Sequence, residues 1–406
     1  MSFRPPKKFV AEPYEYHQEI ELTIDSLSNM GQGVGRDNGW VVFVPFCLPG
    51  EVVKARIFRN DKNCSTADLI EIVKPSPDRL EAPCPLFTQC GGCQYQHLSY
   101  KKQLEWKRDQ VAELLLRMAQ IEAPVNDTLP SPAEYHYRSK LTPHFQKPQS
   151  GKITDIGFLK IGRRQEIIDV PQCPIAMQEI NSALPKLRDQ ARANVKNYKR
   201  GATLLMRATE GRVETNPQAV ATEKVGDLEF NFLAGDFFQN NPFILQAFVD
   251  YAGTKASEGS SRYLVDAYCG SGLFALSLAH RFEKVSGVEV SETSADWARQ
   301  NARTNNITNA DFLAASAEAI FEQIDYPAVE TTVLIDPPRK GCNELFLDQL
   351  FAFKPHRVVY ISCNPATQIR DLAHFITAGY QLDDVQPVDL FPQTKHLECI
   401  ATLTLK

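Results

Sequence analysis

The chain has 406 residues, of which 43% are hydrophobic and 23% charged, and its formal net charge is −5. These values exclude a disordered or fibrous chain and predict a soluble protein of two or three domains. No apolar run approaches the roughly 20 residues that span a bilayer, and the N-terminal residues lack the apolar centre of a signal peptide. We therefore expect a cytoplasmic protein without membrane contact, and a monomer by default.

Charge is unevenly distributed along the chain. Residues 1 to 200 carry 28 basic and 23 acidic side chains, whereas residues 201 to 406 carry 16 and 26. The first half is therefore the better candidate for contact with a polyanion. The chain also has ten cysteines, which in a large intracellular protein indicate metal ligands, nucleophiles or core positions rather than disulfides.

Short alternating strands separated by glycine turns fill residues 20 to 74. This pattern predicts a small closed β-barrel, a fold that often binds RNA through basic and aromatic side chains. A solvated strand face explains equally well the residues that fit such a surface, which are Lys54, Arg56, Phe58, Arg59 and Lys62.

A proline-rich stretch and then a cysteine-rich loop follow the barrel segment. Cys84, Cys90 and Cys93 have the spacing C-x5-C-x2-C around two glycines, and three thiols so close together favour a metal centre over core packing. A fourth ligand must come from elsewhere in the chain. Cys173 is the best candidate because prolines flank it in a predicted loop, and His97 is a second one. The spacing does not separate zinc from an iron–sulfur cluster, since both take four thiolates.

An amphipathic helix is predicted from Tyr100 to Ile121. Its inward side chains would be Leu104, Val111, Leu115 and Met118, and its outward ones Lys101, Lys102, Lys107 and Arg108. A middle region of strands follows, and its basic side chains include Arg164. A helix is predicted next, near residues 175 to 194.

From residue 260 strands and helices alternate, which is the pattern of a doubly wound parallel sheet. The first strand ends in Asp266, and Gly270 and Gly272 then allow a ligand to approach the backbone closely. The next strand ends in Glu289, where an acid can hold two ribose hydroxyls, and a later strand ends in Asp336. No third glycine forms a pyrophosphate-binding turn, so the pattern favours S-adenosylmethionine over a dinucleotide.

Cys363 follows the apolar segment Val358 to Ile361 and precedes a segment with helical spacing. It is therefore predicted at the turn between a buried strand and a helix. A helix N-terminus stabilises thiolate over thiol, and we expect it to lower the pKa of this cysteine. On these residues alone, a small buried cysteine at a strand end is an equally good interpretation.

Together these segments resemble the family of S-adenosylmethionine-dependent RNA uridine-C5 methyltransferases, over nearly the whole chain. The barrel is similar to a TRAM domain, and the cysteine loop to the iron–sulfur motif of the family. The other matching motifs are F-F-Q-N-N, D-A-Y-C-G-S-G, D-P-P-R-K-G, S-C-N-P-A-T and the terminal F-P-Q-T-K-H-L-E. One departure is Tyr268, which stands where phenylalanine is common.

The resemblance implies roles for individual residues. The ligands of a four-iron, four-sulfur (4Fe-4S) cluster would be Cys84, Cys90, Cys93 and Cys173. The site of the methyl donor, S-adenosylmethionine, would be formed by Gln239, Tyr268, Glu289 and Asp336, with Asp266, Gly270 and Gly272. The nucleophile and the base would be Cys363 and Glu398.

The chemistry needs both a thiolate and a carboxylate. Carbon 5 of uracil is a poor nucleophile, but addition of a thiolate to carbon 6 makes an enolate that can attack the methyl group of a sulfonium. A carboxylate must then remove the proton on carbon 5 so that the thiol is eliminated. Glu398 is suitably placed if its predicted strand lies beside the strand that precedes Cys363. The target base must be flipped out of its stack or taken from a loop.

The full prediction is an α/β protein with three domains. Residues 1–76 form a TRAM-like RNA-binding barrel, residues 77–235 a central α+β domain with the cluster, and residues 236–406 a Rossmann-like methyltransferase domain. The acceptor is a uridine in structured RNA, with ribosomal RNA favoured over transfer RNA. The alternatives are a methyltransferase for another acceptor atom, which leaves Cys363 without a role, and a noncatalytic RNA-binding iron–sulfur protein, which leaves the intact site residues unexplained.

Overall fold

The structure is a computed structural model that describes residues 5–163, 165–259 and 261–406, so Arg164 of the predicted basic strands lies outside it. The described chain forms two compact units. The barrel unit runs to Gln110 and includes Phe158–Ile168 and Gln393–Lys395, and the sheet unit contains the rest. The predicted division into three domains stays a prediction. Among the described residues no helix is long and apolar enough to cross a membrane.

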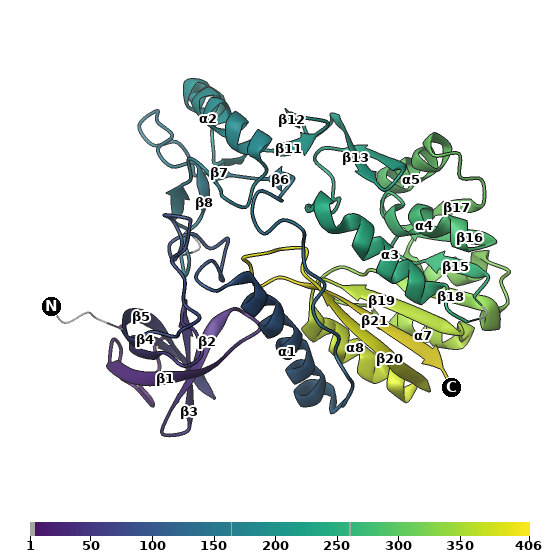
Figure 1. Ribbon diagram of the computed structural model, residues 1–406. Helices are drawn as coiled ribbons and strands as arrows, with labels where there is room; N and C mark the ends of the chain where they lie inside the picture. The colour runs from purple at the N-terminus through teal and green to yellow at the C-terminus, as the bar shows by residue number, and fades with distance from the viewer. Residues whose placement is uncertain (1–4, 164, 260) are drawn as a thin grey trace. The chain divides into compact units, whose positions relative to one another are not determined.

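Five strands of the barrel unit close into a barrel in the order β1-β2-β3-β5-β4 (Figure 1). They are β1 (Glu19–Leu27), β2 (Gln32–Asp37), β3 (Trp40–Pro45), β4 (Val52–Asn60) and β5 (Cys64–Lys74). Side chains alternate between interior and surface along each strand, so Val53, Ala55 and Ile57 of β4 pack inside with Val42 and Val44 of β3. The predicted closed barrel is confirmed.

The basic side chains of β4 do not form a bare basic surface. Each of three pairs with a carboxylate on the barrel itself, in the ion pairs Lys54–Glu19 at 2.7 Å, Arg56–Asp68 at 3.6 Å and Arg59–Asp61 at 2.7 Å. Such exposed pairs add little stability, but they neutralise the positive charge of this face. The solvated strand face is therefore the better interpretation of these residues.

The predicted amphipathic helix is present as α1 (Tyr100–Ala119). Two of its side chains lie opposite to the prediction. Lys107 is fully buried, with Nζ 5.9 Å from the centroid of the Tyr95 ring, and Met118 is exposed. A lysine can be buried in this way because its long aliphatic stem packs like an apolar residue while its ammonium lies over an aromatic face.

A seven-stranded sheet forms the core of the sheet unit, in the order β17-β16-β15-β18-β19-β21-β20 (Figure 1). Its parallel strands are β15 (Tyr263–Asp266), β16 (Lys284–Glu289), β17 (Ala310–Ala314), β18 (Thr331–Ile335) and β19 (Arg357–Ser362). Its antiparallel strands are β20 (Tyr380–Val388) and β21 (Glu398–Leu405). The strand order reverses between β15 and β18, which is where ligands bind in doubly wound folds.

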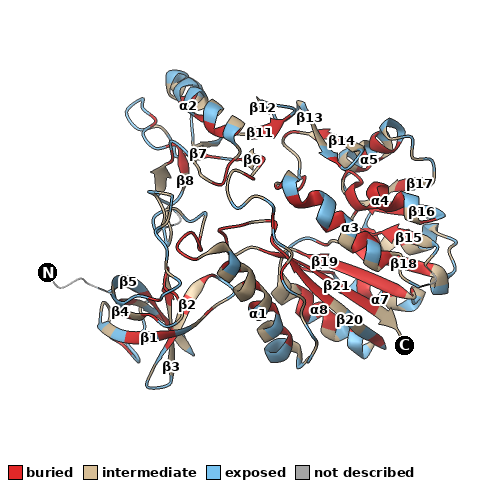
Figure 2. Ribbon diagram, viewed as in Figure 1, coloured by how far each residue is buried: buried red, intermediate tan, exposed pale blue. Residues whose placement is uncertain are grey.

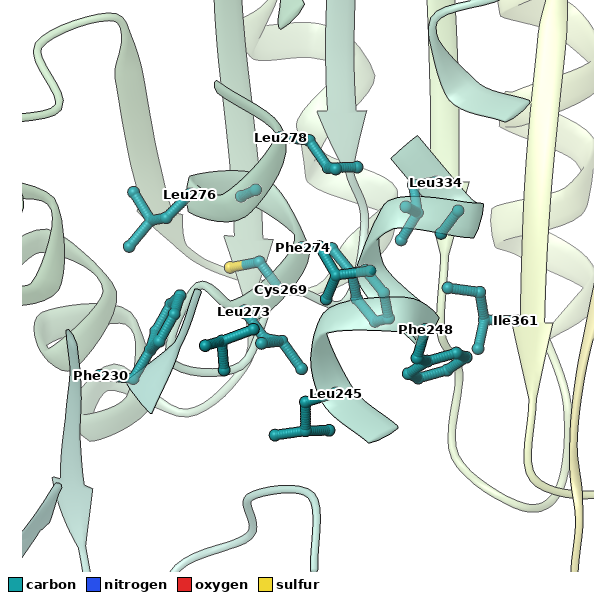
Figure 3. Packing of buried hydrophobic residues seen from close by; sticks show 14 of the residues in the cluster. Phe230, Leu245, Phe248, Cys269, Leu273, Phe274, Leu276, Leu278, Leu334 and Ile361 are labelled. Atoms are coloured by element: carbon teal, nitrogen blue, oxygen red, sulfur yellow. The ribbon is translucent and has the colours of Figure 1, made fainter. Parts of the chain in front are cut away.

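Helices cover both faces of this sheet, so its central strands β15, β18 and β19 are buried on both sides (Figure 2). One face packs against α3 (Leu245–Ala256), α4 (Leu273–Leu278) and α5 (Glu292–Thr304), and the other against α6 (Ile320–Gln323), α7 (Glu344–Phe353) and α8 (Pro365–Thr377). In Figure 3, the sheet residues Leu334 and Ile361 face Phe248 of α3 and Phe274 of α4. The predicted doubly wound fold is confirmed.

Shorter elements lie between the barrel and this sheet in the sequence. The helix is α2 (Gln178–Ala193), and the strands are β6 (Lys140–Leu141), β7 (His144–Phe145), β8 (Gly157–Leu159), β9 (Ile167–Asp169), β10 (Ala202–Thr203), β11 (Met206–Thr209), β12 (Arg212–Glu214), β13 (Val220–Val225) and β14 (Leu228–Leu233). β12, β11 and β6 form one small sheet, and β13 pairs with β14.

The turn between β15 and α4 needs glycine for two different reasons. Gly270 and Gly272 both have left-handed φ angles, of 54° and 94°. A Cβ on Gly272 would stand 2.8 Å from Cδ1 of Leu276, whereas a Cβ on Gly270 would meet nothing within 4 Å. We expect Gly272→Ala to lower the free energy of unfolding by about 2 to 3 kcal/mol and Gly270→Ala by only about 1 kcal/mol. Urea unfolding of both variants measures this, and equal losses would contradict the packing explanation.

Candidate active site

A cavity of about 510 Å³ opens at the carboxyl ends of the parallel strands in the sheet unit. Its walls come from the turn after β15, the end of β16, the segments that follow β18 and β19, the start of β21 and the loop before α3. The lining residues are Phe237, Phe238, Gln239, Tyr268, Cys269, Gly270, Ser271, Leu273, Phe274, Glu289, Val290, Asp336, Pro337, Pro338, Arg339, Cys363 and Glu398.

The structure thus brings together seven of the predicted site residues from six separate segments of the chain. Two others, Asp266 and Gly272, do not line the cavity. Asp266 is buried beneath it and accepts a hydrogen bond from the backbone N–H of Ala275 (3.0 Å). It therefore fixes the turn between β15 and α4 from below.

Cys363 and Glu398 are brought together by the pairing of β19 and β21. In this antiparallel pair Ile361 lies opposite Ile400 and Ser362 opposite Cys399. The same register continued by one residue places Cys363 opposite Glu398, and side chains in such positions lie close together. The role predicted for Glu398 required its strand to lie beside the strand that precedes Cys363. The structure meets this condition.

The surroundings of Cys363 disfavour its thiolate. Cys363 stands in the predicted turn, between β19 and the Pro365 that begins α8. Burial, followed by the carboxyls of Glu398 and Asp336, raises the pKa of its thiol to about 11, and the Arg339 guanidinium acts in the opposite direction. The expectation that the helix N-terminus lowers this pKa is therefore wrong, because desolvation and two acidic neighbours outweigh the helix.

Two of the carboxyls that line the cavity, Glu398 and Asp336, also favour their protonated forms. Glu398 is 4% exposed, and burial together with the charge of Asp336 raises its pKa well above the usual range. Burial and the charge of Asp266 raise the pKa of Asp336. A cavity with several groups of this kind attracts a cation, because a positive charge lowers the pKa of each of them.

The raised pKa of Cys363 has a measurable consequence. Only the thiolate reacts with iodoacetamide, so the alkylation rate of Cys363 in the protein alone should rise about tenfold per pH unit from pH 7 to pH 10. Mass spectrometry of the Cys363 peptide follows the reaction. A rate that levels off below pH 9 would show that the helix N-terminus dominates after all.

The predicted donor-binding acid, Glu289, is held at the end of β16 by the backbone. Its Oε2 accepts from the N–H of Gly270 (3.1 Å), and its Oε1 accepts from the N–H of Ser291 (2.8 Å). A carboxylate has about four lone-pair sites, so both oxygens can still accept ribose hydroxyls. Tyr268 lies beside it in the cavity wall, with its ring edge-on to Phe346 at 5.5 Å.

Two cations, the half-buried Lys140 and the buried Arg207, hold the loop that carries Gln239. Lys140 Nζ donates to the carbonyl oxygens of Gly235 (2.7 Å) and Asp236 (2.9 Å). Arg207 is 1% exposed and donates to Asn240 Oδ1 (3.2 Å). The sequence placed Lys140 only on the basic side of the middle strands and did not single out Arg207, because the neighbours of both residues along the chain give no sign of this loop.

We expect Lys140→Met to weaken binding of the predicted methyl donor by about tenfold, since two charge-assisted hydrogen bonds to the loop are lost. Calorimetric titration with S-adenosylhomocysteine measures the change. Lys147→Met, at an exposed position of the same unit, is the matched control and should bind like the unchanged protein. An unchanged affinity in Lys140→Met would show that the loop keeps its place without this lysine.

The predicted metal ligands are divided between the two units, with Cys84, Cys90 and Cys93 in the barrel unit and Cys173 in the sheet unit. Burial raises the pKa of Cys90 above its usual value, although a hydrogen bond from the Gly92 backbone N–H acts in the opposite direction. Among the described residues, no group of three or more His, Cys, Asp or Glu side chains is arranged to hold a metal ion. The described residues therefore show no cluster, and a cluster held by these four cysteines stays a prediction.

Comparison with known proteins decides the family. A family model described as tRNA (Uracil-5-)-methyltransferase matches residues 193–406, and a TRAM domain model matches residues 16–70. The tRNA (uracil(54)-C(5))-methyltransferase of Schizosaccharomyces pombe is 43% identical, over 97% of this chain and 79% of its own length. The chain belongs to the RNA uracil-C5 methyltransferase family.

A second relative and one solved structure are also similar to this chain. The Saccharomyces cerevisiae protein of the same name is 32% identical, over 96% of this chain and 74% of its own length. The crystal structure of Pyrococcus abyssi tRNA (uracil-54, C5)-methyltransferase in complex with S-adenosyl-L-homocysteine has the same fold, with a TM-score of 0.70, 24% identity and coverage of 95% of this chain and 100% of that one. The predicted RNA uracil-5-methyltransferase with a TRAM barrel is confirmed.

Proposed function

We propose that this methyltransferase transfers the methyl group of S-adenosylmethionine to carbon 5 of a uridine through a covalent bond between Cys363 and carbon 6. The observation that carries the proposal is the β19–β21 register, which sets a thiol opposite a buried carboxyl in the wall of one cavity. A nucleophile and a proton acceptor on adjacent strands can reach carbons 6 and 5 of one ring without moving the fold.

The steps follow from the charges of the cavity. The sulfonium of the donor is a cation, so its binding lowers the pKa values of Cys363 and Glu398 and favours thiolate and carboxylate. The thiolate adds to carbon 6, and the electron pair displaced to carbon 5 forms a bond to the methyl carbon as the bond from that carbon to the donor sulfur breaks. Glu398 then takes the proton from carbon 5, the ring double bond re-forms and the thiolate leaves.

Several features support S-adenosylmethionine as the donor. The cavity lies at the reversal of strand order, where doubly wound sheets bind their ligands. Glu289 presents two backbone-held oxygens to it, and the Pyrococcus abyssi relative was crystallised with the demethylated product of this donor.

The acceptor we propose is uridine 54 of transfer RNA. The relatives from Schizosaccharomyces pombe and Saccharomyces cerevisiae, at 43% and 32% identity, are named for that position. Their names favour transfer RNA over the ribosomal RNA that the sequence suggested.

The test is incubation with 5-fluorouridine-substituted RNA and S-adenosylmethionine, followed by a denaturing gel. Fluorine cannot leave carbon 5 as a proton does, so the methylated adduct stays bound to Cys363. We expect an adduct with transfer RNA, none with a transfer RNA that carries cytidine at position 54, and none with ribosomal RNA. A ribosomal adduct alone would overturn the acceptor, and no adduct with either RNA would overturn the reaction.

A metal in the cysteine loop is a separate proposal, and no step of the reaction depends on it. The spacing C-x5-C-x2-C and the Gly92 N–H donated to the Cys90 sulfur support it, because hydrogen bonds of this kind tune sulfur ligands. Iron, zinc and acid-labile sulfide are measured on protein purified without oxygen, beside Cys90→Ser. Iron and sulfide in equal amounts would show a cluster, zinc alone a zinc site, and neither metal would end the proposal.

A further inference from the structure

Three of the sequence motifs meet at the side chain and backbone of Arg339, which follows β18 and lines the cavity. Its guanidinium Nη2 lies 3.0 Å from Nδ1 of His396, in the segment just before β21. Its carbonyl oxygen accepts from Asn364 Nδ2 (3.1 Å) and from Thr367 Oγ1 (3.2 Å), two residues that follow Cys363 in the chain.

The direction of the Arg339–His396 hydrogen bond follows from the chemistry of the two groups. A guanidinium nitrogen has only hydrogens to offer and stays protonated in proteins. Nδ1 of His396 must therefore be the acceptor, which requires a ring with its proton on Nε2. The ring also contacts Phe391 edge-on at 6.2 Å, so an aromatic neighbour limits its rotation.

This hydrogen bond matters because Arg339 is exposed to solvent. A long charged side chain in solvent spreads over many rotamers, and ordering it costs entropy. When the guanidinium is held in one position, its positive charge counteracts the effect of Glu398 and Asp336 on the pKa of Cys363 and so favours the thiolate. It also favours the carboxylate form of Glu398.

We propose that His396 is a positioning residue, whose Nδ1 holds the Arg339 guanidinium beside Cys363 so that the cation stabilises the thiolate before it attacks. The role rests on the proposed function, since it serves the thiolate that the reaction needs. His396 itself touches neither the nucleophile nor the base in this scheme. It acts only through Arg339, which makes the proposal testable with double variants.

The experiment measures the iodoacetamide alkylation rate of Cys363 at pH 8 by mass spectrometry, without RNA or donor. His396→Leu removes the acceptor and keeps the volume, and it should slow alkylation by about threefold or more, because the thiolate fraction falls tenfold per pKa unit. His396→Asn places Oδ1 where Nδ1 was and should stay within about twofold of the unchanged protein. His280→Leu, at an exposed histidine of the same unit, should have no effect.

Arg339→Gln supplies the decisive comparison. If His396 acts through Arg339, then adding His396→Leu to Arg339→Gln should change the alkylation rate no further, since the two effects belong to one interaction. Thermal unfolding verifies that each variant is folded, and His396→Ala replaces His396→Leu if the latter is not.

Two results would overturn the proposal. One is an alkylation rate in His396→Leu equal to that of the unchanged protein, and the other is an equal slowing by His396→Leu with and without Arg339. Failure of the protein to methylate any uridine would instead count against the proposed function, and it would leave the alkylation result as it stands. In the methylation assay we expect His396→Leu to lower kcat more than it raises KM for RNA, because the cation acts during the reaction rather than in binding.

Discussion

Replacement of Cys363 by alanine is expected to abolish methylation, with a loss on the order of 10⁴-fold or more. Without a thiolate at carbon 6 no enolate forms, and carbon 5 of an unactivated uracil attacks the methyl group very slowly. Transfer of a radioactive methyl group from S-adenosylmethionine to transfer RNA measures the loss. The same variant should bind S-adenosylhomocysteine like the unchanged protein, which separates a missing nucleophile from a damaged cavity.

The control for this variant is Cys64→Ala. Cys64 is a half-buried thiol at the start of β5 in the barrel unit, so its removal tests whether the loss of any partly accessible cysteine matters. It should keep activity within about twofold, as substitutions away from the site usually do. Substantial methylation by Cys363→Ala would contradict the covalent reaction and favour direct transfer to another acceptor atom.

The fold followed from local patterns, because the residues that form each element are neighbours in the sequence. Val358 to Ile361 are apolar without interruption, as expected for a strand covered on both faces, and β19 is buried throughout. The turn that carries Cys363 could be placed for the same reason. In the helix α1 the period was correct, yet Lys107 is buried, because what covers a helix face depends on the elements that pack there.

The ionisation of the site could not be predicted from the segment around Cys363. That segment shows a helix N-terminus, which favours the thiolate. The carboxyls that outweigh it come from other strands, since Asp336 follows β18 and Glu398 lies on β21. The burial that raises the pKa of Cys363 also depends on these distant segments. The hydrogen bond between Arg339 and His396 could not be predicted for the same reason, since the two residues lie 57 positions apart in the chain and only the sheet order brings their segments together.

Glu398→Gln is expected to stop the reaction after methyl transfer rather than before it. The amide keeps the size of the side chain but cannot accept the proton from carbon 5, so the thiol cannot be eliminated. Turnover should fall by about 10²- to 10⁴-fold, while a covalent complex with ordinary, unfluorinated transfer RNA accumulates. A denaturing gel with labelled RNA shows this complex, and label from the methyl donor should travel with it.

The position of the label distinguishes the explanations for this variant. If Glu398 is the base, the trapped RNA carries both the protein and the methyl group, and the double variant Cys363→Ala with Glu398→Gln forms no complex. If Glu398 instead serves only to shape the cavity, Glu398→Gln should form no methylated complex with ordinary RNA. With 5-fluorouridine RNA it should then form less adduct than the unchanged protein does. The buried setting of Glu398 argues for the first result, because burial and the charge of Asp336 raise its pKa and so make its carboxylate form the stronger base.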